Sequence, residues 1–259
     1  MKDNGLLVQY FNANTPADQT LWAKAAKDAV TLKKIGATAV WFPPATKGAA
    51  GKEDMGYAPY DLYDLGEFNQ KGSVGTRYGT KKEYLEAIDA MKAQGINVYA
   101  DIAVRQKLGA DSVEKVTAAD FNAKDIPQMI GNKKIVGALS KFTFAGRRSK
   151  YSKFKWNWNH FAGIDWQQDD FKKRVCELSG MTEEEAEKKY KLSKYDYIIG
   201  SELDLYNQEV YDELMTWAKW YEDVTGVDGF RFQEAEKVPG WFIRDFAEAA
   251  SNAGEEEKE

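Results

Sequence analysis

The alternation of short apolar runs with helix-patterned segments constrains the fold of this chain most. Apolar runs of strand length lie at 6–11, 38–42 and 96–104, and segments with helical spacing separate them. Strands that alternate with helices predict right-handed crossovers and a parallel sheet buried on both faces. The rhythm resumes near 207 with a helix, a strand at 227–232 and a last helix that ends near 250.

The segment 105–205 interrupts this alternation of strands and helices. It is rich in Lys, Asp and Trp and shows no clean hydrophobic period. A structureless connection of this length is improbable in a compact fold, so we expect a small irregular or β-rich domain inserted after the third strand. The expected domains are therefore 1–104 together with 206–259, and the insert 105–205.

Composition excludes several classes of function. The chain has 259 residues and a net charge of -5 without long basic runs, which argues against nucleic acid as a partner. No apolar stretch is long enough to span a bilayer, and the apolar run after Met1 is too short for a signal peptide. These features predict a cytoplasmic protein that does not bind membranes.

A polar cluster follows the strand at 227–232. The stretch 229–234 reads Gly-Phe-Arg-Phe-Gln-Glu, so the apolar strand ends in Gln233 and Glu234. In α/β barrels the chemistry lies at the carboxyl ends of the strands. The cluster is therefore the first candidate site, although Gln233 is a neutral amide.

Collinear motifs resemble the alpha-amylase family, glycoside hydrolase family 13, and in particular the N-terminal half of bacterial liquefying-type alpha-amylases. The similar segments are 7–11, 39–45, 56–68, 71–74, 78–81 and 154–161. The resemblance implies the first four βα units of a (β/α)8 TIM barrel, with a domain inserted after the third strand. It also implies retaining hydrolysis of α-1,4-glucans, which requires a carboxylate nucleophile and a carboxylic acid.

The resemblance fails at the catalytic positions. The family motif Gly-Phe-Arg-Leu-Asp-Ala places Gln233 where the nucleophilic Asp belongs, and an amide cannot form the glycosyl-enzyme ester. The family His that contacts the sugar is replaced by Gln106. Glu234 is the one candidate for a rescue, but strand alternation directs it to the opposite face unless a bulge re-aims it. The family's other two catalytic carboxylates lie on later strands that this sequence does not contain.

The resemblance implies that the calcium site is lost and that no cofactor is needed. The positions of the family's calcium ligands hold Arg105, Asp196 and Glu202, and Lys237 stands where the family has His. A guanidinium cannot help to bind a cation, but it can replace one. We expect Arg105 to pair with Asp196 or Glu202, the alternative being that it projects into solvent.

Some positions that bind substrate in the family are kept. Tyr57 matches the Tyr that stacks on the sugar, and Asp101 and Arg231 are expected to form a buried pair. Trp156 and His160 lie in a motif that lines or supports the cleft. The alternative is that the tryptophans form the core of the insert and that His160 is a hydrogen-bonded structural residue.

These features predict a catalytically inactive alpha-amylase-like protein with weak α-glucan or maltooligosaccharide binding, or with a scaffold role. Four βα units leave two open sheet edges and an apolar inner face, so we expect a homodimer or a complementing chain. The alternative is an active α-1,4-glucan hydrolase that a second chain or a second copy completes.

Overall fold

A computed structural model of the 259-residue chain describes residues 5–121, 129–166, 173–177 and 200–251. The chain divides into two compact units. The first comprises Met1–Val104, Ala145–Tyr151 and Leu214–Glu259, and the second comprises Arg105–Phe144 and Ser152–Glu213.

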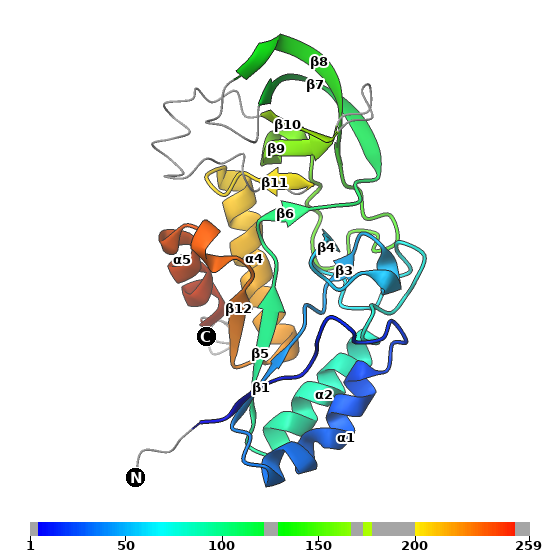
Figure 1. Cartoon of the computed structure of the whole chain (residues 1–259), viewed down its shortest axis with the longest axis vertical. Helices are drawn as coiled ribbons and strands as arrows, with labels where there is room; N and C mark the ends of the chain where they lie inside the picture. Colours follow the sequence, from blue (N-terminus) through cyan, green and yellow to red (C-terminus); the bar gives the residue numbers. More distant parts are fainter. Residues whose placement is uncertain (1–4, 122–128, 167–172, 178–199, 252–259) are drawn as a thin grey trace. The chain divides into compact units, whose positions relative to one another are not determined.

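The first unit contains a four-stranded sheet with the order β1-β2-β5-β12. Its strands are β1 (Leu7–Gln9), β2 (Ala39–Phe42), β5 (Asn97–Ile102) and β12 (Gly229–Phe232). All three pairings are parallel, as the alternating pattern predicts. Strands β1 and β12 form the two ends of this sheet (Figure 1).

Helices cover one face of the sheet. They are α1 (Leu21–Lys34), α2 (Lys81–Ala93), α4 (Gln208–Thr225), which begins in the second unit, and α5 (Gly240–Ser251). Phe42 packs against Trp22 of α1, and Phe230 and Phe232 pack edge-on against Phe246 of α5. Helix α2 begins with a capping box between Thr80 and Glu83. None of the helices in the described ranges is long and apolar enough to cross a membrane.

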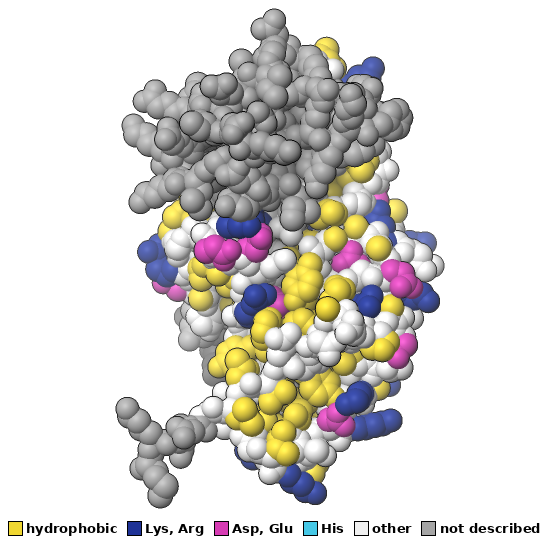
Figure 2. All heavy atoms as spheres, in the orientation of Figure 1, with side chains coloured by type: hydrophobic (Ala, Val, Ile, Leu, Met, Phe, Trp, Pro, Cys, Tyr) yellow, Lys and Arg dark blue, Asp and Glu magenta, His cyan; other side chains and the backbone are white. Residues whose placement is uncertain are grey.

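The opposite face of the sheet carries a different set of side chains. Strand register places Leu7, Trp41, Tyr99, Asp101 and Arg231 on this face, because paired residues of parallel strands point the same way. Leu7 is 57% exposed, whereas the helix-facing Val40 and Phe42 are fully buried. Apolar side chains also reach the surface over β1 and α1 in Figure 2.

A loop region beside the sheet completes the first unit. It contains the antiparallel pair β3 (Lys47–Gly48) and β4 (Pro59–Asp61) and the 3₁₀ turn η1 (Gly51–Glu53). A further 3₁₀ turn, η3 (Ala235–Lys237), lies between β12 and α5. The excursion Ala145–Tyr151 returns to this unit, where Arg147 pairs with Asp61.

The second unit contains a six-stranded antiparallel sheet with the order β6-β11-β9-β10-β7-β8. Its elements are β6 (Gln106–Lys107), β7 (Ser112–Phe121), β8 (Met129–Lys141), the turn η2 (Trp158–His160), β9 (Phe161–Trp166), β10 (Lys173–Glu177) and β11 (Ser201–Leu203). The long pair β7–β8 has register shifts after Ser112 and Ala118. A bulge breaks the two-residue period, which is why the sequence pattern shows no strand there.

Candidate functional site

The carboxyl ends of β5 and β12 hold an ion pair. Arg231 lies opposite Asp101 in the parallel register, and its Nη1 donates to both carboxylate oxygens of Asp101 at 3.1 and 3.0 Å. The Asp101 side chain is fully buried, whereas the side chain of Arg231 is 44% exposed. The expected pair is therefore present, but only its aspartate is buried, because the Arg231 side chain is exposed in part.

Tyr57 joins this pair through its hydroxyl, which donates to Asp101 Oδ2 at 2.7 Å. Burial raises the pKa of the Asp101 carboxyl, while the Tyr57 hydroxyl and the Arg231 guanidinium oppose that rise. Burial and the adjacent carboxylate also raise the pKa of Tyr57 well above its ordinary value. Tyr57 thus remains a protonated donor at neutral pH. The Asp101 carboxylate accepts hydrogen bonds from both Tyr57 and Arg231.

Trp41 extends the same face and is a residue that the sequence reasoning missed. The guanidinium carbon of Arg231 lies 4.7 Å from the centroid of the Trp41 ring, and Phe11 packs edge-on against that ring at 5.3 Å. A cation over an indole face is favourable, and the stacking fixes the Arg231 side chain. The signal in the sequence was the alternation within Ala39–Phe42, which places Trp41 away from the helices.

Gln233 follows the last residue of β12. Its backbone N–H donates to the Ile102 carbonyl oxygen at 2.9 Å, so it continues the ladder beside the end of β5. Its side-chain Oε1 is buried and has no hydrogen-bond partner among the described residues. A buried acceptor without a donor is costly, so the Gln233 amide lies at the end of β12 at an energetic cost.

Glu234 does not continue the strand. Strand β12 ends at Phe232, and Glu234 has the left-handed backbone angles φ 50° and ψ 47° at the start of η3. The alternation argument therefore does not describe its direction, because it holds only within a strand. The carboxylate accepts a hydrogen bond from Lys237 Nζ at 2.5 Å. Glu234 is thus committed to a local ion pair.

The second unit pairs Arg105 with Glu202. Arg105 Nη2 donates to Glu202 Oε1 at 2.9 Å, and the two side chains are 7% and 14% exposed. The expected ion pair is present, so the alternative in which Arg105 projects into solvent is wrong. Asp196 lies outside the described residues. Gln106 is buried on β6 and lies opposite Glu202 on β11. Within the described ranges, no three His, Cys, Asp or Glu side chains gather as a metal site would require.

Trp156 and His160 form an aromatic cluster with Phe154. Trp156 and His160 are both buried, and their ring centroids are 5.7 Å apart. The Asn157 backbone N–H donates to His160 Nδ1 at 3.1 Å, and His160 Nε2 lies 3.0 Å from Glu209 Oε2. The first bond makes Nδ1 an acceptor, so Nε2 carries the proton and donates to Glu209. These contacts favour a structural role for both residues.

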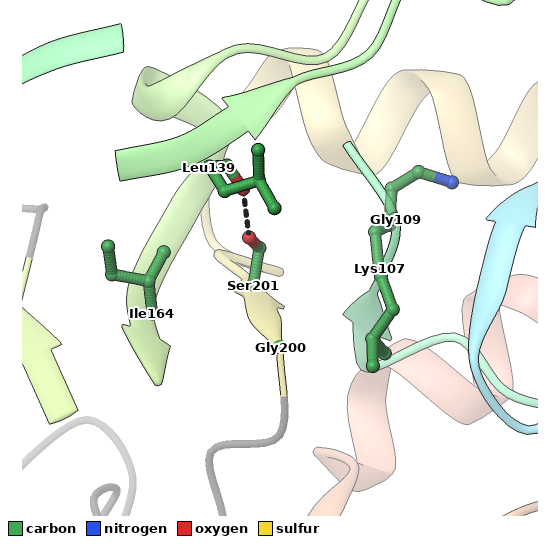
Figure 3. A pocket seen from close by; sticks show the side chains of 7 residues that line it. Lys107, Gly109, Leu139, Ile164, Gly200 and Ser201 are labelled. Carbon is green, nitrogen blue, oxygen red and sulfur yellow. Dashed lines mark hydrogen bonds between the residues drawn. The ribbon is translucent and has the colours of Figure 1, made fainter. Parts of the chain in front are cut away.

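A cavity of about 120 Å³ lies in the second unit (Figure 3). Its described lining consists of Lys107, Leu108, Gly109, Leu139, Ile164, Gly200 and Ser201. The Ser201 hydroxyl donates to the Leu139 carbonyl at 3.3 Å, and the Lys107 ammonium lies 5.2 Å from the Trp156 ring centroid. Because this lining provides no carboxylate, the cavity is a weaker candidate for glycoside chemistry than the ends of β5 and β12.

The fold and the polar cluster define an α/β protein with its polar site at the carboxyl ends of parallel strands. No family model matches the chain. It is 44% identical over 244 residues to an alpha-amylase of Geobacillus stearothermophilus, and the matching segment covers 94% of this chain and 44% of that protein. It is also 37% identical over 254 residues to the cytoplasmic alpha-amylase of Escherichia coli strain K12, and this match covers 95% of this chain and 50% of that protein.

A solved structure is similar in fold. The alpha-amylase of Geobacillus thermoleovorans in complex with acarbose matches with a TM-score of 0.53 and 16% identity, over 95% of this chain and 43% of that chain. The chain thus spans about half the length of the relatives it matches. The resemblance found in the sequence is confirmed, since the chain is similar to alpha-amylases over nearly its whole length.

Proposed function

We propose that this chain is an alpha-amylase relative that binds α-glucans without hydrolysing them. The observation that carries the proposal is Gln233 at the end of β12, where the family's motif has its nucleophilic carboxylate. Retaining hydrolysis needs a carboxylate that attacks the anomeric carbon, and an amide oxygen does not. The neighbouring carboxylates are already engaged, since Asp101 is bound by Tyr57 and Arg231 and Glu234 pairs with Lys237.

The same cluster is suited to a sugar. Trp41 and Tyr57 contribute aromatic rings, which pack against the apolar faces of pyranoses. The half-exposed guanidinium of Arg231 has N–H donors that sugar oxygens could accept. The names of the relatives and the acarbose complex support an α-glucan as the ligand class. Binding is expected to be weak, because one half-exposed cluster buries little of the ligand.

We also propose that the parallel sheet is the first half of a (β/α)8 barrel and that the second unit is its inserted domain. Support comes from the sheet order, from the partly exposed face of β1 and β2, and from the fold of the amylase structures. In the 259-residue chain a second copy or a complementing chain is expected to cover this face. The Arg105–Glu202 pair supports a fold that needs no calcium. A cytoplasmic location stays a proposal, which the name of the Escherichia coli relative supports.

The second candidate is an active α-1,4-glucan hydrolase that another chain or a second copy completes. The retained trio of Tyr57, Asp101 and Arg231 favours it, because these groups would surround a sugar in the family's cleavage subsite. In that case Gln233 would not be the decisive residue, and the partner would supply the reacting carboxylates.

Titration calorimetry with maltoheptaose, combined with a reducing-sugar assay on starch, separates the two candidates. For the proposed function we expect saturable binding of maltoheptaose. The chain should release no more sugar from starch than the variant Gln233→Ala does. Release by the purified chain at higher concentration, with a steep dependence on protein concentration, would support the second candidate. Absence of any binding would refute the proposed function.

Gln233→Asp is the matched variant, because it restores the residue type of the family's nucleophile, a carboxylate one methylene shorter than glutamine. If this variant releases sugar while the parent chain does not, the amide alone blocks hydrolysis. If neither does, the remaining catalytic groups are also required. Thermal melts with calcium and with a chelator test the metal proposal, and a large stabilisation by calcium would contradict it.

A further inference from the structure

A buried lysine in the first unit is surrounded by oxygen atoms. Lys47 on β3 has a fully buried side chain. Its Nζ donates to the carbonyl oxygens of Phe68, Ser73 and Val74 at 3.1, 2.8 and 2.6 Å. The fourth oxygen, Asp64 Oδ2, lies 3.5 Å from Nζ. Three donors and three carbonyls match one to one, and the carboxylate balances the charge.

The chain itself fixes the carboxylate of this cage, which we define as Asp64 with the carbonyls of Phe68, Ser73 and Val74. Asp64 Oδ1 accepts from the backbone N–H groups of Gly66, Glu67 and Phe68 at 2.9, 2.9 and 3.2 Å. Gln70 Nε2 donates to Asp64 Oδ2 at 2.9 Å. The Asp64 side chain is fully buried. These bonds involve the loop alone, so most of the oxygen arrangement does not depend on the lysine side chain.

Such an arrangement resembles an ion site more than an ordinary salt bridge. Backbone carbonyl oxygens that converge on one point replace the hydration shell of potassium in selective channels. Calcium instead takes six to eight oxygen ligands, commonly including several carboxylates. Four oxygens with one negative charge therefore fit a monovalent cation, and an ammonium group is close to potassium in size.

We propose that the loop 64–74 forms a monovalent-cation site that Lys47 fills with its own ammonium group. A chain without this side chain binds free potassium or ammonium at the same four oxygens. In the natural chain the Lys47 ammonium group occupies the site, so the stability of the loop does not depend on which salt is present. The inference does not rest on the proposed glucan binding, because none of the cage residues belongs to the cluster around Asp101.

Lys47→Ala tests the inference, because it opens the cage and keeps its oxygens. Its thermal unfolding is measured in choline, potassium, ammonium and calcium chlorides at equal ionic strength. We expect Lys47→Ala to unfold earlier than the parent chain in choline, and its midpoint to rise by at least about 3 °C, with saturation, in potassium or ammonium. The parent chain should show no such difference between salts.

Lys47→Met is the matched control. Its side chain fills the cage without a charge, so its midpoint should not respond to potassium. An equal response of all three proteins, or no response of Lys47→Ala, would overturn the proposal. A response to calcium larger than the response to potassium would overturn the monovalent assignment.

Refolding covers the case in which Lys47→Ala does not fold in choline. Its refolding yield after dilution from urea is then measured against potassium concentration, beside Lys47→Met. A yield that rises with potassium for Lys47→Ala alone supports the site. Yields that stay equal in choline and in potassium refute it.

Discussion

Two Asp–Arg pairs in the first unit have the same chemistry and different surroundings. In the pair under the loop region, Arg147 Nε lies 2.8 Å from Asp61 Oδ2, and both side chains are 1% exposed. In the pair at the strand ends, the Asp101 side chain is fully buried but the Arg231 side chain is 44% exposed. Arg147 also donates to the Lys150 carbonyl and lies over the Tyr63 ring. Both side chains of the first pair are thus buried, while the second pair exposes part of its cation at the end of the sheet.

The difference teaches that an ion pair alone does not mark a functional site. Removing one partner of a buried pair leaves an uncompensated charge, which is why such pairs hold structure so strongly. A pair with one outward partner costs less to break and has donors to offer a ligand. Four measurements test this contrast.

The largest effect is expected for Arg147→Met. This variant leaves Asp61 buried without its cation, so we expect the free energy of unfolding to fall by about 3–5 kcal/mol. Urea unfolding followed by tryptophan fluorescence measures it. The double variant Arg147→Met with Asp61→Asn should recover part of the loss, and a loss below about 1 kcal/mol would show that the pair is not the anchor of the 145–151 excursion.

Arg231→Met should cost less stability, about 1–2 kcal/mol, because the Arg231 side chain is partly solvated and Tyr57 still donates to Asp101. Maltoheptaose binding should fall at the same time. Arg231→Lys is the control, since it keeps the charge and loses the planar donor geometry. If Arg231→Met destabilises as strongly as Arg147→Met, the contrast between the two pairs is wrong.

Tyr57→Phe removes one hydrogen bond from Asp101 and leaves the ring in place. We expect a stability loss of about 1 kcal/mol, because Arg231 continues to hold the carboxylate. Equilibrium unfolding gives the stability, and calorimetry gives the affinity for maltoheptaose. A retained affinity would indicate that the ring of Tyr57 contacts the sugar and that its hydroxyl does not.

The smallest effect concerns Glu67, which belongs to a third and more exposed network. Burial raises the pKa of Glu67, but hydrogen bonds from Lys150, Tyr151 and Lys81 outweigh it and lower the pKa to about 2. A depressed carboxyl pKa adds stability above the unfolded pKa of about 4.3, and this contribution disappears as the pH falls towards 2. Glu67→Gln should therefore cost about 0.5–1 kcal/mol at pH 7 and almost nothing near pH 2. Thermal melts across this pH range check the slope, and a pH-independent difference would contradict it.

The elements of the parallel sheet were largely predictable from the sequence. Their sequences are short and mostly apolar, and the helix at 81–93 has its capping box in the sequence. The Asp101–Arg231 pair followed from the family resemblance because both residues are kept. The Arg105–Glu202 pair also followed from the resemblance, which implies that both residues stand at positions of the family's calcium ligands.

Other features depend on contacts that the sequence pattern does not encode. Arg147 meets Asp61 across 86 positions, and the oxygens around Lys47 come from a loop that has no periodic signal. The left-handed Glu234 lies beyond the strand end, where alternation no longer applies. The position of Trp41 beside Arg231 follows only from the strand register, which the sequence pattern does not give.

The excursion Ala145–Tyr151 has a consequence for protein engineering. The chain passes from one unit to the other at 104–105, 144–145, 151–152 and 213–214, so neither unit is a single uninterrupted segment. A simple gene fusion cannot transplant the second unit. A graft of 105–213 into a related scaffold must keep Arg147 and provide an aspartate in the place of Asp61, or the returning segment arrives with a buried and uncompensated cation.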